Sequence, residues 1–342
     1  MVIMKRTGID LQAIACMDNL ADAAVKAARG KRFRTDVQDF FQSFETNLHN
    51  LRTDILNGKV PYGHYTSFTI HDPKERTIHA ACFKDRVIHH ALMNHAGPVL
   101  ERAMVPTAFA CRLGKGPLAA VHWVQRGIRR FPWYVKVDIR RYFDSIDHEI
   151  LCQIVTRRIK GNEVLSLIRR IIGSYHTIPG KGLPIGSLTS QYFANYYLDG
   201  LDRSIMERLG ACAHARYMDD VIWCCHDRAA GKATLAHVKE YLSEERLLDL
   251  KDNIQINRSC KGVTYCGFRI FPGFLKLSSR RCKRYTARRK FWEHAYLRGK
   301  INEKKLQSAY ASVYGIIAHA DSLEWRKEQL LRYPSIIMEQ EG

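Results

Sequence analysis

The sequence lacks the features that mark secreted, zinc-binding and membrane proteins. Its ten cysteines are scattered without a Cys-x-x-Cys pair, so we expect reduced, buried thiols and no zinc site. No apolar run approaches the length of a membrane span, and the segment before Thr7 is too short and polar for a secretory signal. There is no internal repeat or low-complexity segment. We expect a soluble, cytoplasmic protein with no membrane partner.

Acidic residues are also scarce. Lys and Arg number 54 against 34 Asp and Glu, which gives a net charge of +20. So basic a chain suits a polyanionic partner such as nucleic acid, although a merely basic soluble protein has the same composition. With 342 residues, 46% of them hydrophobic, the chain is long enough for two or three subdomains.

Residue patterns predict an α+β chain in which an antiparallel sheet is backed by helices on one face. The predicted helices are residues 8–57 (interrupted at Gly30-Lys31-Arg32), 83–100, 145–160, 188–209 and 229–248, with a helical, basic tail from Ser278. The predicted strands are two segments within 64–82 around a turn at Asp72-Pro73-Lys74, then 133–139, 213–217, 221–225, 263–268 and 274–277. Residues 173–187, rich in Gly and Pro, are predicted to form a loop.

Three aspartates are the candidate catalytic groups. Asp138 ends a strong strand pattern, and Asp219 and Asp220 lie at the tip of a predicted hairpin 81 residues later. If these strands pair, the carboxylates converge, and two or three of them on rigid strands can hold two Mg²⁺ ions for phosphoryl transfer. Taken alone, Met218-Asp219-Asp220 is equally well explained as an ordinary polar turn.

Several segments, in a fixed order over roughly residues 55–290, resemble the motifs of reverse transcriptases. Tyr217-Met218-Asp219-Asp220 is similar to their signature box, and residues 137–146 to their first aspartate motif. Residues 183–191 resemble the loop-to-helix motif between these two, and residues 262–268 the primer-grip hairpin. Residues 73–76, 83–92 and 108–116 resemble the motifs of the fingers. The ordered set is far more specific than any one motif.

The resemblance implies a right-hand polymerase fold with fingers, an antiparallel-sheet palm backed by helices, and a helical thumb. Residues 1–131 would form an N-terminal helical extension and the fingers. Residues 132–272 would form the palm, with a fingers insertion at about 150–184, and residues 273–342 the thumb.

Catalytic and nucleotide-binding roles follow from the same resemblance. Asp138 and Asp219, with the adjoining Ile139 and with Asp220 as a supporting acid, would hold two Mg²⁺ ions, with Mn²⁺ as an alternative. The residues implied to contact the incoming dNTP are Lys74, Arg76, Ile139, Phe143, Ile185, Gly186, Gln191 and Lys251. Phe143 matches the bulky position that blocks a ribose 2′-hydroxyl, with a core aromatic as the alternative. Lys74 and Arg76 have the alternative of a solvated hairpin, and a surface lysine is the favoured interpretation of Lys251.

A further group of residues is implied to contact template RNA and the RNA/cDNA duplex: Tyr217, Met218, Gly267, Arg280, Arg284 and Arg288. On a helix the three arginines share one face, which would follow a phosphate backbone, whereas a solvated basic face is the alternative. A second basic cluster, Lys26 to Arg34, is a candidate contact for template RNA or for an accessory protein.

One motif points to a subgroup. Most reverse transcriptases have Gln before the glycine of the loop-to-helix motif and end it in Ser-Pro, whereas this chain has Ile185-Gly186 and ends in Ser190-Gln191. That version is similar to the reverse transcriptases of bacterial and phage diversity-generating retroelements, which copy a template RNA into cDNA with errors opposite adenine. The similarity implies a small basic helical accessory protein as a partner. Since Ile185 offers no hydrogen bond, it would loosen discrimination at the nascent base pair. Simple packing in a turn is the other explanation of Ile185.

Other interpretations stay open. A retron-like or phage-defence reverse transcriptase would have the same catalytic motifs, but its Asn-Ala-x-x-His segment is missing here. The 65 residues after Leu277 are too few for the maturase region of group II intron enzymes, or for a fused RNase H or integrase. A catalytically inactive RNA-binding scaffold is the alternative from another class, and the intact aspartates argue against it.

Overall fold

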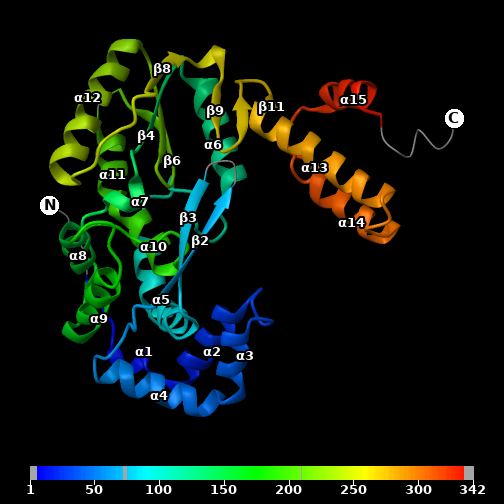
Figure 1. Ribbon diagram of the computed structural model, residues 1–342. Helices are drawn as coiled ribbons and strands as arrows, with labels where there is room; N and C mark the ends of the chain where they lie inside the picture. Colours follow the sequence, from blue (N-terminus) through cyan, green and yellow to red (C-terminus); the bar gives the residue numbers. More distant parts are fainter. Residues whose placement is uncertain (1–5, 72–74, 209, 335–342) are drawn as a thin grey trace.

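A four-stranded antiparallel sheet forms the centre of the computed structural model, which describes residues 6–71, 75–208 and 210–334 (Figure 1). The predicted turn at residues 72–74, including Lys74, lies outside the described residues. The strands run in the order β6-β7-β4-β8, and their bounds are Cys212–Tyr217, Asp220–Cys225, Trp133–Asp138 and Gln255–Arg258. The first three were predicted: β4 from its aromatic and β-branched residues, and β6 and β7 as the two arms of a hairpin around Met218-Asp219-Asp220. The sequence prediction missed β8.

Both faces of this sheet are buried, so the expectation of helices on one face was wrong. Successive residues of a strand point to opposite faces, and Val135 and Trp223 join one hydrophobic core while Tyr134 and Ile222 join another. Helices α10 (Leu188–Tyr197), α11 (Asp199–Glu207) and α12 (Arg228–Glu245) belong to the first core. Helix α6 (Pro117–Arg130), which was not predicted, covers the other face together with a small sheet.

The N-terminal region is helical, as predicted. It consists of α1 (Leu11–Ile14), α2 (Met17–Ala28), α3 (Thr35–Gln42) and α4 (Phe44–Leu56). Gly30 separates α2 from α3 with a positive φ of 69°, a conformation that a glycine adopts without strain. Alanines on α2 pack against the long helix α5 (Phe83–Ala103), and Asn19 donates a hydrogen bond to the Ala91 carbonyl at 3.1 Å.

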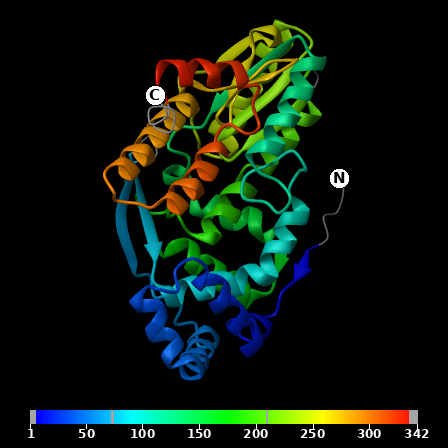
Figure 2. The same cartoon turned by 90° about the vertical axis from the view of Figure 1, so that its right-hand side faces the viewer.

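A hairpin of strands β2 (Tyr65–His71) and β3 (Glu75–Ala81) precedes α5 and confirms the prediction for residues 64–82. Both views show it reaching from the N-terminal helices toward the C-terminal helices (Figures 1 and 2). Its base is fixed by the Asp85 carboxylate, which accepts hydrogen bonds from the backbone N–H groups of Tyr62 and Gly63.

The segment between β4 and β6 departs from its prediction. Residues 145–160 are not one helix but the end of α7 (Tyr142–Ser145), helix α8 (His148–Thr156) and strand β5 (Ile159–Lys160). Asp147 interrupts the helix because its carboxylate caps α8, accepting from the N–H groups of Glu149 and Ile150. β5 pairs with β1 (Thr7–Gly8), and helix α9 (Asn162–Gly173) follows. Residues 174–187 form a loop, largely as predicted.

The C-terminal part begins with a three-stranded sheet of β9 (Val263–Tyr265), β10 (Phe268–Ile270) and β11 (Leu275–Leu277). The predicted strand 263–268 is therefore two strands, because Cys266 and Gly267 both have positive φ and turn the chain. Three helices complete the fold: α13 (Ser279–Leu297), α14 (Glu303–Tyr314) and α15 (Leu323–Arg332).

The structure can be compared with the sequence-based expectations for the cysteines and for membrane-spanning helices. All ten cysteines are free thiols, and Cys224 and Cys225 are buried as expected. Cys16, Cys111 and Cys260 are exposed, so the expectation of buried thiols was wrong for them. Among the described residues, each helix is too short or too polar to cross a bilayer.

Candidate polymerase active site

The pairing of β4 with β7 brings the three predicted catalytic aspartates together. Asp138 and Asp220 are directly opposite each other in the antiparallel register, and the Ile139 N–H donates to the Asp219 carbonyl at 3.1 Å. The acids therefore lie at one end of the central sheet, on two hydrogen-bonded strands. Rigid support of this kind is what a constellation of metal-binding carboxylates requires.

Two lysines stand among these carboxylates. The Lys136 ammonium, on the same face of β4 as Asp138, lies 2.7 Å from Asp220 Oδ1 and 3.1 Å from Asp138 Oδ2. Lys251 Nζ lies 3.5 Å from both Asp138 Oδ1 and Asp219 Oδ2. Lys136 is 8% exposed and Lys251 is 37% exposed, so the first is a buried counter-charge and the second faces solvent.

The cluster still carries more negative charge than the lysines neutralise. Burial, together with the charges of Asp138 and Asp219, raises the pKa of Asp220 to about 7 even though Lys136 acts in the opposite direction. Burial alone would lower the pKa of Lys136, but Asp220 and Asp138 outweigh it and the pKa is raised. A cation would relieve this repulsion, and carboxylate oxygens are the ligands that Mg²⁺ prefers.

The donor set therefore fits a magnesium site chemically. Across residues 6–71, 75–208 and 210–334, no three His, Cys, Asp or Glu side chains converge tightly enough to hold one ion as they are placed. The carboxylates are instead spread around the two ammonium groups. Ile139 is fully buried, so only its backbone can take part in the role predicted for it.

Lys251 lies beside the catalytic aspartates. Its backbone N–H donates to the Asp138 carbonyl at 2.8 Å, which extends the antiparallel contact beyond the end of β8 and directs the side chain at the acids. The side chain is 37% exposed and also lies beside the carboxylates, so its role toward the dNTP stays a prediction. Lys136, by contrast, was missed entirely, although its two-residue spacing from Asp138 on a strand puts both side chains on one face.

The hairpin tip is fixed by a buried arginine that the sequence analysis also missed. Met218 has a φ of 58°, and its carbonyl accepts a hydrogen bond from Arg216 Nη1 at 3.2 Å. Arg216 is fully buried and is bound by Asp202 of α11 through both Nε and Nη2, at 2.7–2.9 Å. The same guanidinium donates to Asn195 of α10. The tip that presents Asp219 is thus joined to two helices beneath the sheet.

Asp202 is held ionised within this core. Burial would raise its pKa, but Arg216 and His214 outweigh burial and lower it to about 2. His214 Nε2 lies 3.1 Å from Asp202 Oδ1, and its Nδ1 is 2.9 Å from the Thr107 hydroxyl. An arginine in a strand is usually interpreted as solvent-facing, and only the partner Asp202, fourteen residues earlier on a helix, would have indicated otherwise.

The loop-to-helix motif lies against both the aspartate motif and β3. Leu183 N–H donates to the Phe143 carbonyl at 2.8 Å, and His79 N–H of β3 donates to the Ile185 carbonyl at 3.1 Å. Gly186 has a φ of 109°, and a Cβ there would lie 2.9 Å from Ile78, so glycine is required. Phe143 and Ile185 are half-buried, and so is Gln191 on α10.

The residues predicted to bind nucleic acid divide into two groups. Tyr217 and Met218 are half-buried at the hairpin tip, and the turn at Gly267 lies beside the tip because the Tyr265 hydroxyl donates to the Asp220 carbonyl at 3.2 Å. The stripe Arg280, Arg284 and Arg288 is exposed on α13, as predicted. Not all of the basic run faces outward, since Arg289 is buried and lies 3.3 Å from Glu293. Arg76 is exposed on β3.

The basic cluster at Lys26–Arg34 borders a cavity next to the loop-to-helix motif. The cavity is about 190 Å³ and is lined by Lys26, Arg29, Lys31 and Arg86, by His89 and His90, and by Gly186 and Ser187. Burial, and the neighbouring Arg86 and Arg34, lower the pKa of Lys31, which is the behaviour of a cation among other cations. The N-terminal helices therefore present positive charge close to Gly186.

Comparison with known proteins identifies the family. The sequence model of the family described as reverse transcriptase (RNA-dependent DNA polymerase) matches residues 71–270, which is more than half of the 342-residue chain. The chain belongs to the reverse transcriptase family. The family's palm fold accounts for the mixed helix-and-sheet structure, and RNA-directed DNA polymerase activity and binding of template RNA follow for the family in general.

The similar proteins are distant. Protein YkfC of Escherichia coli (strain K12) is 24% identical over 176 residues, which are 45% of either chain. Group II intron-encoded protein LtrA of Lactococcus lactis is 26% identical over 141 residues, 39% of this chain and 23% of LtrA. Nuclear intron maturase 2 of Arabidopsis thaliana is 22% identical over 139 residues, 36% of this chain and 19% of the maturase. The chain thus spans less than half the length of these relatives.

Replacing the buried lysine of the site is expected to cost stability. Lys136→Met leaves Asp138 and Asp220 without their buried counter-charge, so we expect the free energy of unfolding to fall by about 3–5 kcal/mol. Lys251→Met is the matched control, since that side chain is 37% exposed against 8% for Lys136 and should contribute less than about 1 kcal/mol. Urea denaturation of both variants without divalent cations measures the difference, and equal losses would contradict the assignment.

The Arg216–Asp202 pair can be tested for a role beyond stability. Arg216→Met alone should cost about 3–5 kcal/mol, because Asp202 is left buried and unpaired. Combining it with Asp202→Leu replaces the pair by apolar groups and should recover most of that loss. Since the Met218 carbonyl still lacks its donor, we expect kcat for dNTP incorporation to remain at least about tenfold reduced. A double variant with normal stability and normal kcat would limit the pair to a structural role.

Proposed function

We propose that this chain is the reverse transcriptase of a diversity-generating retroelement, which copies a template RNA into cDNA with frequent errors opposite template adenines. Family membership supports the polymerase reaction, and the opposition of Asp138 to Asp220 in the β4–β7 register is the observation that carries it. The subgroup rests on Ile185-Gly186 and Ser190-Gln191. The intron-encoded relatives share the family but do not bear on this subgroup.

In the proposed site, Asp138 and Asp219 hold two Mg²⁺ ions, the backbone of Ile139 adjoins them, and Asp220 supports them from the facing strand. The ions would supply charge neutralisation for nucleotidyl transfer. The Lys136 ammonium lies between Asp138 and Asp220, at 3.1 and 2.7 Å, and supplies a positive charge to both carboxylates. Lys251, at the rim of the cluster, would meet the phosphates of the incoming dNTP, as would Lys74 and Arg76.

The nucleic acid is proposed to pass between the hairpin tip and the C-terminal helices. Tyr217, Met218 and the turn at Gly267 would contact the primer end, and the α13 arginines would follow the duplex backbone. We assign residues 1–131 to the N-terminal extension and fingers, 132–272 to the palm and 273–342 to the thumb. The Lys26–Arg34 cluster would contact template RNA, and a small basic accessory protein remains the proposed protein partner.

Low fidelity is proposed to follow from Ile185. Its carbonyl is bound by His79 of β3 and the next residue is a required glycine, so the backbone at this position is fixed. A half-buried branched alkyl group there offers neither a donor nor an acceptor to the nascent base pair. Discrimination would then rely on shape alone, which separates similar base pairs weakly.

The catalytic assignment predicts the effect of one isosteric change. Asp219→Asn removes a charge from the cluster, so we expect dNTP incorporation on a primed RNA template to fall below detection with Mg²⁺. Asp252→Asn is the matched control, because that carboxylate is 96% exposed and pairs with Arg140 outside the cluster. Single-turnover extension assays compare the two. Full activity in Asp219→Asn would refute the assignment.

The subgroup proposal predicts the error spectrum. Ile185→Gln should lower misincorporation opposite adenine by about fivefold, since one added hydrogen bond is worth about 1 kcal/mol. Ile178→Gln, in the same loop but exposed, should leave the errors unchanged. Sequencing of cDNA from a defined template measures both. A wild-type enzyme that makes no excess of adenine errors would favour a retron-like or intron-encoded type of reverse transcriptase.

A further inference from the structure

Two long stretches of the chain contain no acidic residue, and the fold brings them together. Residues 102–137 and 253–292 carry eighteen lysines and arginines and no Asp or Glu. They meet where β4 pairs with β8, in a register that sets Trp133 opposite Arg258. The Ser259 N–H donates to the Pro132 carbonyl at 2.8 Å and closes this end of the pairing. Neither of the two segments that meet at this pairing contributes an acidic side chain to it.

A groove of about 430 Å³ lies at this junction. Three arginines line it: Arg129 and Arg130 at the end of α6, and Arg258 at the end of β8. The aromatic rings of Phe131 and Trp133 form part of its wall. Figure 1 shows α6 beside β9 and β11 at this end of the molecule.

The arginines of the groove are arranged to bind an anion. The Arg130 guanidinium carbon lies 5.4 Å from the centroid of Phe131, and that of Arg258 lies 5.8 Å from the centroid of Trp133. A guanidinium over an aromatic ring is held in orientation and still presents its N–H donors to a phosphate. In the part of the chain that the structure describes, none of the three arginines forms an ion pair with an acid.

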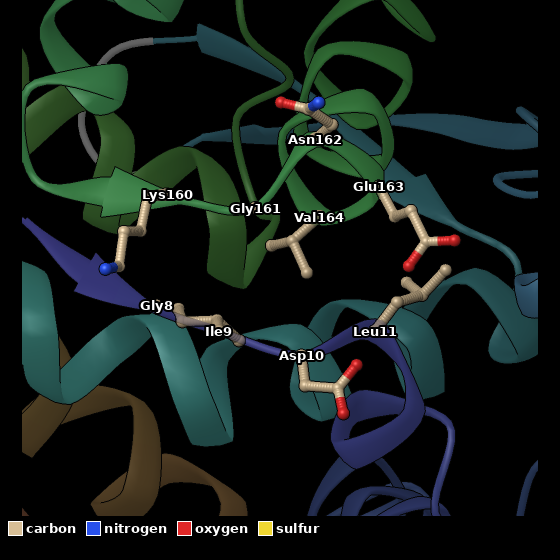
Figure 3. Close-up of a pocket in the computed structure, with 9 residues that line it drawn as sticks. All are labelled: Gly8, Ile9, Asp10, Leu11, Lys160, Gly161, Asn162, Glu163 and Val164. Carbon is tan, nitrogen blue, oxygen red and sulfur yellow. The ribbon is translucent and has the colours of Figure 1, made fainter.

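An acidic side chain at this end of the sheet is engaged in capping a helix. Asp227 follows β7 at this end of the sheet, and its carboxylate caps α12 by accepting from the Ala230 N–H at 2.7 Å. A second hollow of similar size shows the contrast. The cavity in Figure 3, about 500 Å³, is lined by Asp10 and Glu163 as well as Lys160, so its charge is mixed and it suits no polyanion.

The groove is remote from the catalytic acids. β4 begins with Trp133 at the groove and ends with Asp138 at the active site, a strand length of about 17 Å. RNA bound in the groove is therefore not the segment whose base is being copied at Asp138.

We propose that this groove is a second RNA-binding surface, which takes the sugar–phosphate backbone of a folded segment of the template RNA outside the copied region. It would anchor the RNA through phosphate contacts that are independent of base sequence. The proposal rests on membership of the reverse transcriptase family, not on the diversity-generating subgroup, so an ordinary error spectrum would leave it intact.

The test uses the full-length enzyme with its active site already filled. The enzyme is saturated with a short RNA template annealed to a chain-terminated primer, together with the next dNTP, and a labelled blunt-ended RNA duplex is then titrated. We expect the duplex to bind the filled enzyme with one-to-one stoichiometry. The combined Arg129→Gln, Arg130→Gln and Arg258→Gln variant should bind it at least about tenfold more weakly, with a salt dependence shallower by about two to three in log–log slope.

A matched variant removes the same charge elsewhere. Arg157 just after α8, Lys160 on β5 and Arg169 on α9 are exposed cations. Changing all three to Gln should leave duplex affinity within about twofold of wild type. Both triple variants should extend the short primed template as wild type does. Equal loss in the two variants, no loss in the groove variant, or loss of short-template extension in the groove variant would each overturn the proposal.

Cys260 provides a second measurement in the unmodified protein. This exposed thiol lines the groove, whereas Cys16 is exposed on the N-terminal helices. Bound duplex should slow maleimide alkylation of Cys260 in the filled enzyme and leave the rate at Cys16 unchanged, as followed by mass spectrometry. Equal rates at Cys260 with and without duplex would place the RNA elsewhere and contradict the proposal.

Discussion

The antiparallel pairing of β4 with β7 is the constraint on which the site depends, because it brings acids 81 residues apart into one cluster. The pairing is stabilised from both faces of the sheet, where Trp223 is buried on one side and Tyr134 on the other. A strand slip of one residue would exchange these faces and turn Asp138 into the core. Register and catalysis are therefore fixed by the same apolar packing.

Neighbouring cationic side chains explain how the fold tolerates three carboxylates at one end of the β4–β7 pair. Lys136 neutralises part of the cluster from within the sheet, and Lys251 does so from the solvent side. Beneath the tip, Arg216 and Asp202 form a second, fully buried ion pair that holds the backbone of Met218. The two lysines supply positive charge to the carboxylates, and the Arg216–Asp202 pair fixes the hairpin that carries Asp219.

The sequence predicted what depends on local pattern and missed what depends on tertiary partners. The strand at 133–138 follows from aromatic and β-branched residues, the strand at 220–225 from the hairpin around Met218-Asp219-Asp220, and ordered motifs identified the family. Helix α6 and strand β8 were missed, and the strand at 263–268 was not divided at its turn. Arg216 could not be recognised as buried without Asp202, which reaches it from another helix. Lys251 was judged a surface residue because only the short contact of residues 249–251 with the end of β4 brings it to the acids.

The central claim is that Asp138, Asp219 and Asp220 form one cation-binding centre for nucleotidyl transfer. Anomalous diffraction from crystals of the enzyme with primed RNA template, the next dNTP and Mn²⁺ tests it most directly. The account predicts two peaks, each within bonding distance of a carboxylate oxygen of Asp138 or Asp219, with Lys136 still paired to Asp220. Manganese found only away from these carboxylates, or Asp138 turned from the hairpin tip, would contradict it.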